Sequence, residues 1–191
     1  WNGESYGVFW NDSREAGTCY GNRQNIYYAQ VNNLGEKVLG DIKLQKADTG
    51  YSQLESVVWD DNNYAITYRG SVVSAYLAKM NKDGDALYAD IPINTVGFGG
   101  GTQISWNGKN YFIAWGDGRD RTPDTFYNTE IYFTKFDTDG NKLIPETRVT
   151  YQNDPSNENT KIMFLHSKIG LAWKETKQDR PAIYFGSAPI D

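Results

Sequence analysis

Cysteine, histidine and methionine are nearly absent from this 191-residue chain, which contains one Cys, one His and two Met. A single cysteine, Cys19, excludes an internal disulfide framework. A single histidine leaves no candidate for a Ser-His-Asp triad and no partner with which to bind a metal ion. The sequence therefore predicts no catalytic residues, no metal ligands and no bound cofactor.

The chain also lacks an excess of positive charge and any long apolar run. It has 19 Lys and Arg against 24 Asp and Glu, which gives a formal net charge of −5. Nucleic-acid binding needs a basic surface, so we expect no nucleic-acid partner. No run approaches the ~18 apolar residues of a membrane helix, so we expect no membrane insertion. Because Trp1 replaces a start Met, we expect a processed or excised piece.

Aromatic residues and glycines, in contrast, are abundant, with 14 Tyr, 6 Trp, 8 Phe and 19 Gly. This composition favours β-strands that pack on both faces. In residues 103–150, apolar runs are separated by Asn107-Gly108 and Asp139-Gly140. Such dipeptides predict hairpins, because both turn residues need positive φ angles. We therefore predict four antiparallel strands in this stretch, with Gly140 and the similar Gly84 in tight turns.

The same four-strand pattern recurs along the chain. The second strand of each unit is predicted at residues 6–10, 64–68, 111–115 and 169–173. The third strand is predicted at residues 25–28, 74–77, 130–133 and 182–185. Four-stranded units that repeat about every 50 residues are typical of the blades of a β-propeller.

We therefore predict an all-β fold, a single β-propeller domain of four-stranded antiparallel blades. The approximate repeats are 1–51, 52–98, 99–157 and 158–191. Repeat one has almost no first strand, and repeat four ends before a fourth strand. We favour a closed four-bladed ring, because the chain contains four copies of the central hairpin. Part of a larger propeller and a β-sandwich are the alternatives.

Two segments resemble the repeat of a known group of proteins. Trp10-Asn11-Asp12-Ser13-Arg14 precedes Asn25-Ile26-Tyr27, and Trp115-Gly116-Asp117-Gly118-Arg119 precedes Glu130-Ile131-Tyr132. This Trp-x-Asp-x-Arg … Ile-Tyr … Asp-Gly pattern resembles that of secreted bacterial β-propeller repeat proteins. Repeat two lacks the Asp-x-Arg, and repeat four has a weakened version of it. The resemblance implies a propeller fold and export, and it implies no single activity.

The two Asp-x-Arg segments are the candidate ligand site. Residues two apart in an extended segment point the same way, so Asp12 with Arg14 presents a carboxylate and a guanidinium together. Asp117 with Arg119 does the same. Because the second strands of all blades run in one direction around a ring, both pairs are expected on one face.

Aromatic residues in the two long loops that follow these pairs complete the candidate site. They are Tyr20, Phe126 and Tyr127. In one interpretation the Asp–Arg pairs fix the loops and the rings cover the core. In the other, the rings stack on sugar faces while the polar groups bind hydroxyls.

The predicted function is a secreted or surface-exposed binding module that recognises a glycan or an extracellular protein, and we expect a monomer. A protein–protein interaction scaffold without a small ligand is one alternative. A sialidase-like glycoside hydrolase is another, since sialidase-type propellers use a Tyr nucleophile with carboxylates. Such enzymes resemble six-bladed rings with an arginine triad, and no Ser-x-Asp-x-Gly-x-Thr-Trp box occurs here. We therefore favour binding over catalysis.

Overall fold

The fold is taken from a computed structural model that describes residues 1–15, 24–44, 52–70, 74–97, 99–121, 129–151, 156–165, 168–177 and 180–189. In these ranges the regular elements are β-strands in four antiparallel sheets. None of these residues belongs to a helix long and apolar enough to cross a membrane. The predicted all-β fold with four sheets is confirmed.

Each sheet contains strands that are consecutive in the sequence. The first sheet is formed by β1 (Tyr6–Asp12), β2 (Asn25–Val31) and β3 (Lys37–Lys43). The second sheet is formed by β4 (Ser52–Trp59), β5 (Tyr64–Gly70), β6 (Ala75–Met80) and β7 (Ile91–Pro92). The third sheet is formed by β8 (Gly99–Trp106), β9 (Tyr111–Asp117), β10 (Glu130–Phe136) and β11 (Lys142–Arg148). The fourth sheet is formed by β12 (Ser156–Leu165), β13 (Lys168–Lys177) and β14 (Arg180–Pro189).

The strands occur where the repeated pattern predicts them. The second strands of the units are β1, β5, β9 and β13, and the third strands are β2, β6, β10 and β14. The two end sheets have three strands each, whereas the two middle sheets have four. Within the described ranges, the first sheet has no strand before β1 and the fourth has none after β14, as the incomplete end repeats predict.

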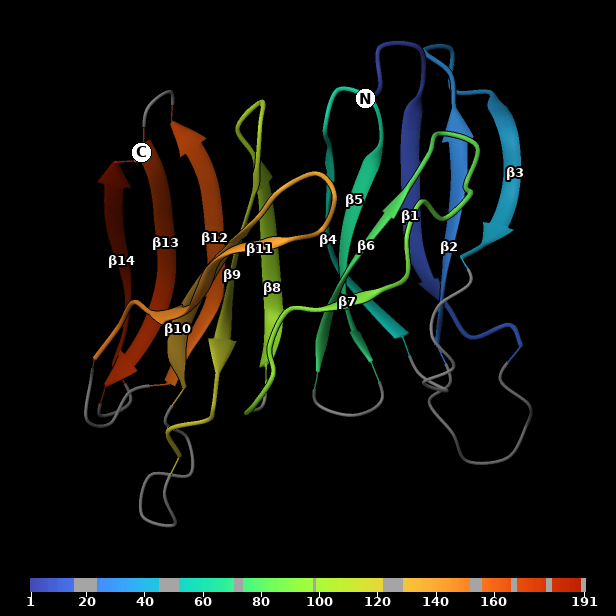
Figure 1. The fold of residues 1–191 in the computed structure, drawn as a ribbon. Helices are drawn as coiled ribbons and strands as arrows, with labels where there is room; N and C mark the ends of the chain where they lie inside the picture. The colour runs from blue at the N-terminus through green and yellow to red at the C-terminus, as the bar shows by residue number, and fades with distance from the viewer. Residues whose placement is uncertain are drawn as a thin grey trace.

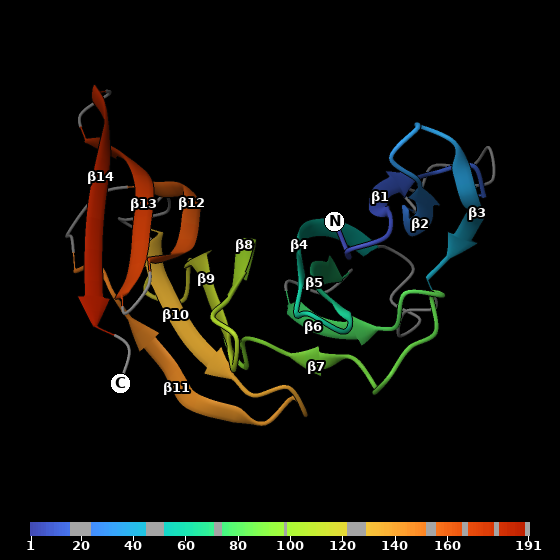
Figure 2. The same cartoon turned by 90° about the horizontal axis from the view of Figure 1, so that it is seen from above.

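The four sheets follow one another around an arc, with the first and fourth sheets at its two ends (Figure 2). The strands β4 and β8 lie on the inner side of this arc, and β7 and β11 lie on the outer side. Among the described strands, none in the first sheet contacts one in the fourth. The arc is therefore open, unlike the closed four-bladed ring that we favoured, because closure depends on the angle between sheets rather than on the strand pattern.

Apolar side chains fill the space between the first and second sheets and the space between the second and third sheets. Ile26 and Tyr28 of the first sheet pack with Tyr68 of the second. Leu77 of the second sheet packs with Trp115 of the third. The middle strands thus bury both faces, and β5 and β9 are buried over most of their length. The outermost strand β11 instead alternates between exposed and half-buried residues, as expected for a strand with one face in water.

Glycines with positive φ form the tight turns between strands. Gly84, Gly108 and Gly140 have φ angles of 97°, 87° and 86°, which confirms the turns predicted at these glycines. The carboxylate of Asp137 accepts hydrogen bonds from the backbone N of Asp139 and of Asn141, at 3.0 and 2.8 Å. This carboxylate therefore stabilises its own turn. No group of three or more His, Cys, Asp or Glu side chains is placed to hold a metal ion in the described part of the chain.

We expect Gly140→Ala to lower the free energy of unfolding by about 1–2 kcal/mol, the cost of placing a side chain in the left-handed region. The added Cβ would also collide with the side chain of Ile91. Urea denaturation measures the change. Gly40→Ala is the control, because Gly40 has open space around its Cα and no positive φ. Equal costs at the two glycines would contradict the prediction.

Candidate functional site

The two Asp–Arg segments begin at the ends of equivalent strands. Asp12 is the last residue of β1, and Asp117 is the last residue of β9. Both strands point toward the lower end of the molecule in Figure 1. Both Asp–Arg pairs therefore lie on the same side of the arc, which we call the strand-end face.

In the first sheet, Asp12 and Arg14 pair with each other. Arg14 donates to the Asp12 carboxylate from its backbone N at 2.7 Å and from Nε at 2.8 Å. Trp10 Nε1 also donates to Asp12, at 3.2 Å. The guanidinium of Arg14 pairs in addition with Asp41 of β3, at 3.1 Å. It lies over the ring of Tyr27, with 4.6 Å between the guanidinium carbon and the ring centroid.

The hydrogen bonds from Arg14 lower the pKa of Asp12 from 3.8 to about 2. Because the folded state favours the charged carboxylate, the pair contributes stability above the ordinary pKa, and this contribution is lost as the pH falls from about 4 to 2. An NMR titration of the Asp12 carboxyl group should give a midpoint near 2. In Arg14→Ala the midpoint should move upward, toward the ordinary value. An unchanged midpoint in that variant would mean that another group lowers the pKa.

The third sheet repeats this arrangement with a buried pair. Arg119 donates to the Asp117 carboxylate from its backbone N at 2.8 Å and from Nη2 at 2.7 Å. Trp115 Nε1 donates to the same carboxylate at 2.9 Å. Arg119 Nη2 also pairs with Glu146 of β11 at 2.6 Å. The guanidinium carbon lies 4.2 Å from the centroid of the Tyr132 ring.

Electrostatics at Glu146 agree with this pairing. Burial alone would raise the pKa of Glu146, but hydrogen bonds from Arg119 and Lys142 outweigh burial and hold that pKa below its ordinary value. Lys142 Nζ lies 3.1 Å from the Glu146 carboxylate. The two cations therefore keep this carboxylate charged inside the third sheet.

The two copies differ in their access to solvent. The side chain of Arg14 is 48% exposed, whereas that of Arg119 is 17% exposed. The side chain of Asp117 is fully buried. Arg119 thus acts as a buried link between the end of β9 and β11, and Arg14 is the copy that is exposed to solvent.

In both sheets the Trp ring also lies against the Tyr ring, with 5.9 Å between the centroids of Trp10 and Tyr27 and 6.0 Å between those of Trp115 and Tyr132. An equivalent ring pair occurs in the other two sheets. Tyr68 stacks on Tyr76 with 5.3 Å between ring centroids, and Tyr68 Oη donates to Asp90 at 2.6 Å. Trp173 stacks on Tyr184 with 5.9 Å between centroids. The ring pair therefore belongs to the repeat, while the Asp-x-Arg belongs to the first and third sheets alone.

Sequence reasoning missed the acids on the outer strands that bind the arginines. Asp41 on β3 and Glu146 on β11 each lie 27 residues after the arginine that they bind, and this shared spacing is the signal that could have identified them. Tyr27 and Tyr132, the rings on which the two arginines lie, could have been identified from the sequence. Both are the Tyr of the repeated Ile-Tyr pair.

The aromatic part of the predicted site, Tyr20, Phe126 and Tyr127, lies outside the described residues, as does Cys19. Its role in binding stays a prediction. The described part of the site consists of the two Asp–Arg pairs together with the acids and rings that hold them.

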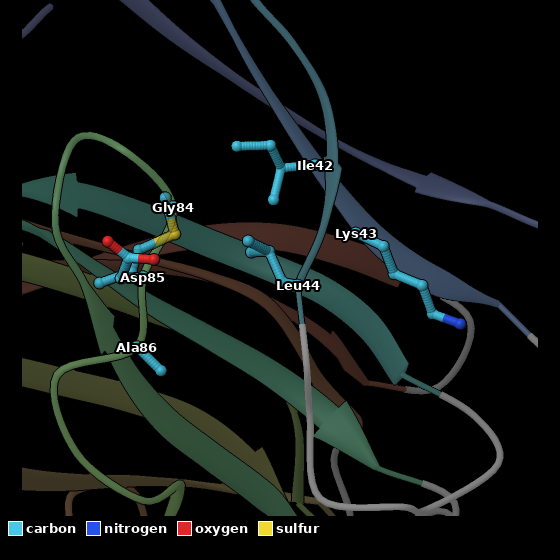
Figure 3. A pocket seen from close by; sticks show the side chains of 7 residues that line it. Ile42, Lys43, Leu44, Gly84, Asp85 and Ala86 are labelled. Atoms are coloured by element: carbon cyan, nitrogen blue, oxygen red, sulfur yellow. The ribbon is translucent and has the colours of Figure 1, made fainter.

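A cavity of about 440 Å³ lies between the end of β3 and the turn that follows β6. It is lined by Ile42, Lys43, Leu44, Met80, Gly84, Asp85 and Ala86. Figure 3 shows Lys43 directed away from the other lining residues, and its Nζ pairs with Glu15. Ligand sites combine an apolar lining with several convergent polar groups. With Asp85 as its remaining charged side chain, this cavity is a weaker candidate than the strand-end face.

No protein-family model and no curated protein matches the chain. Solved structures do match its fold. The subtype N11 neuraminidase-like protein of A/flat-faced bat/Peru/033/2010 (H18N11) aligns at 13% identity with a TM-score of 0.51, over 88% of this chain and 45% of that chain. The GH43 endo-arabinanase of Bacillus licheniformis aligns at 12% identity with a TM-score of 0.54, over 98% of this chain and 71% of that chain. The fold is a β-propeller.

The four sheets are thus blades of a propeller, and the strand-end face is one side of it. The chain spans less than half the length of the N11 neuraminidase-like protein that it matches. At identities of 12–13% the likeness establishes the propeller fold and no activity.

Proposed function

We propose that this propeller is a glycan-binding module of a secreted or surface-exposed protein, and that it binds through the strand-end face with Arg14 as a contact. The observation that carries the proposal is the exposure of Arg14. Arg119 makes the equivalent contacts in the third sheet while it is buried. The contacts that hold the blade together therefore do not require the arginine to be exposed, as Arg14 is. Of the solved structures with this fold, one is named an endo-arabinanase and another a neuraminidase-like protein, which supports a glycan as the ligand.

The charges around Arg14 favour a neutral sugar. Arg14 and Lys37 pair with Asp41, at 3.1 and 2.6 Å. Lys43 pairs with Glu15, and Arg14 pairs also with Asp12. Among these described side chains three cations thus face three acids, so their charges balance and do not favour an anionic ligand. A guanidinium has five N–H donors, so Arg14 retains donors for hydroxyl groups beyond those that its carboxylate partners use.

Rigid placement of Arg14 would help it to select a ligand. The Tyr27 ring below the guanidinium and the two carboxylates beside it fix the plane of the N–H groups. A donor group that is already ordered loses less conformational entropy when a ligand binds. The long loops after β1 and β9 would supply the aromatic surface for the sugar faces, as the sequence predicts for Tyr20, Phe126 and Tyr127.

A glycan array probed with the whole chain tests the proposal. We expect binding to neutral glycans, and we expect Arg14→Ala to weaken it about 10- to 100-fold, the effect of losing hydrogen bonds to a charged group. Lys37→Ala is the matched control, because it removes a cation that binds the same Asp41 and should leave affinity unchanged.

Three outcomes would contradict the proposal. Equal binding by Arg14→Ala and the wild-type chain would remove Arg14 from the site. A blank array, together with a pull-down that recovers one extracellular protein, would favour an interaction scaffold. Turnover of a chromogenic glycoside would make the chain a hydrolase rather than a binding module.

A further inference from the structure

The turn after β6 and the turn after β10 pack in the same way against the sheet that precedes each of them. Gly84 and Gly140 lie in these turns with φ angles of 97° and 86°. Ile42 of the first sheet lies against Gly84, and Ile91 of the second sheet lies against Gly140. At these turns, the contact between the first and second sheets is therefore equivalent to the contact between the second and third sheets.

Backbone hydrogen bonds show the same equivalence on the outer strands. Leu44, directly after β3, donates from its backbone N to the Ile26 carbonyl at 2.9 Å. Ile93, directly after β7, donates to the Ala75 carbonyl at 2.8 Å. Each of the two acceptors directly precedes the Tyr of its strand. Leu44 and Ile93 therefore have corresponding positions in the first and second sheets.

Between the second and third sheets, a lysine side chain lies at this position. Lys142, two residues after Gly140, donates from Nζ to the Ile93 carbonyl of the second sheet at 2.8 Å. The same Nζ pairs with Glu146 at 3.1 Å. It also lies 5.6 Å from the centroid of the Phe136 ring. A carbonyl, a carboxylate and an aromatic ring thus surround this ammonium group.

Between the first and second sheets, this lysine is absent and the cavity of about 440 Å³ lies in its place. Two residues after its turn glycine, the second sheet has Ala86 in place of Lys142. As the last residue of β6 it has Met80 in place of Phe136. Both smaller residues line the cavity, and Figure 3 shows Leu44 across from Ala86. The cavity is therefore the space that a longer side chain occupies between the next two sheets.

The lysine belongs to the repeat, so its replacement in the second sheet is a specific change. In the first sheet, Lys37 follows the turn glycine at the same spacing and pairs at 2.6 Å with Asp41, four residues later. The lysine of the third sheet pairs with an acid at the same spacing. In the second sheet that acid is Asp90, four residues after Ala86. The second sheet thus keeps the acid and lacks the lysine.

The polar groups around the cavity suit a cation. Asp85 lines the cavity, and its carboxylate accepts a hydrogen bond from Asn81 Nδ2 at 3.0 Å. Lys43 is also a lining residue, but its side chain is directed away and pairs with Glu15 (Figure 3). The backbone carbonyl of Leu44 corresponds to the carbonyl that accepts from the lysine of the third sheet. A carboxylate and a carbonyl are therefore available to an ammonium group here.

We propose that this cavity binds a primary alkylammonium group, with its carbon chain along Met80 and Ala86 and its ammonium against the Leu44 carbonyl and the Asp85 carboxylate. The ligand takes the place that Lys142 takes between the second and third sheets. A volume of about 440 Å³ lies in the range of small-molecule sites, so the group can be the end of a larger molecule. A free amine and the lysine side chain of a peptide both offer this group.

Titration of the isotope-labelled whole chain with n-butylammonium, followed by NMR, tests the proposal, because this ion has the carbon chain and charge of a lysine side chain. We expect about millimolar affinity, since so small a ligand makes few contacts. The signals of Met80, Gly84 and Ala86 should shift most. 1-Butanol has the same carbon chain without the charge, and it should bind about 10-fold more weakly.

Two substitutions locate the bound group. Ala86→Lys should abolish binding, because the new side chain would fill the cavity. Leu87→Lys is its matched control, since it adds the same charge at the next residue, which is exposed and outside the lining, and it should leave affinity unchanged. Asp85→Asn keeps the cavity open and should weaken binding of n-butylammonium about 2- to 5-fold, the effect of losing an exposed ion pair. Circular dichroism checks that each variant is folded.

A second probe, Nα-acetyl-lysine methylamide, separates the two sources of the group. If it binds as n-butylammonium does, a lysine of a peptide enters the cavity. If n-butylammonium alone binds, the ligand is a free amine. Either result supports the proposal.

Four results would overturn the proposal. They are equal affinity for n-butylammonium and 1-butanol, shifts confined to residues outside the cavity, undiminished binding by a folded Ala86→Lys chain, and undiminished binding by Asp85→Asn. None of these measurements involves a sugar or Arg14, so this proposal and the glycan proposal fail separately.

Discussion

Replacing Trp115 with Ala should lower the free energy of unfolding by about 3–5 kcal/mol, the range for deleting a large buried aromatic side chain. Trp115 is fully buried between the second and third sheets. Its loss would leave a cavity beside Leu77 and Tyr132. It would also remove the hydrogen bond from its Nε1 to the buried Asp117. Denaturation in urea, followed by fluorescence and circular dichroism, measures the change.

Trp106 provides the control for this substitution. It lies in the same sheet, is half-buried at the edge of the same cluster, and donates from Nε1 to Asp61 at 3.0 Å. Trp106→Ala should cost about 1–2 kcal/mol, because less apolar surface is removed from the interior. Equal costs for the two tryptophans would mean that the second and third sheets do not pack as described.

Arg119→Ala should also lower the free energy of unfolding by about 3–5 kcal/mol, the cost of removing one partner from a buried ion pair. The carboxylates of Asp117 and Glu146 would then remain in the interior without their shared cation. Arg14→Ala makes the same chemical change at the exposed copy and should cost much less than Arg119→Ala, because solvent screens an exposed ion pair. The two variants, measured side by side in urea, separate the structural copy from the accessible one.

The result also decides what the Asp–Arg motif does in each sheet. Similar small costs in both variants would mean that Arg119 does not tie β9 to β11. Similar large costs would mean that Arg14 is structural too, and the glycan proposal would lose its central residue.

The strands were predictable because their signals are local. Tyr111 to Trp115 is apolar at each position, as a strand buried on both faces requires, and Gly108 and Gly140 mark the turns on either side of the central hairpin. The same pattern in the other units gave the order of the strands. It also predicted that the first sheet lacks its first strand and that the fourth sheet lacks its fourth strand, as the described residues show.

The site and the shape of the arc were less predictable, because both depend on relations between distant residues. The pairing of Arg14 with Asp41 requires the register of β2 on β3, which contains irregularities on either side of Gln30. No short-range pattern reveals such shifts. Likewise, the angle between successive sheets is set by how residues such as Leu77 and Trp115 fill the space between them. That angle decides whether four sheets close a ring.

In the described part of the chain each sheet packs only against the sheets next to it in the sequence, and this affects how well the chain tolerates substitutions. Among the described strands, each middle sheet contacts two sheets and each end sheet contacts one, and none links the first sheet to the fourth. In such a nearest-neighbour array, stability is a sum of the terms for single sheets and for adjacent pairs. A substitution in the second or third sheet therefore weakens two couplings at once. In the first or fourth sheet it weakens one, so the outer sheets have more freedom to change residues without loss of the fold.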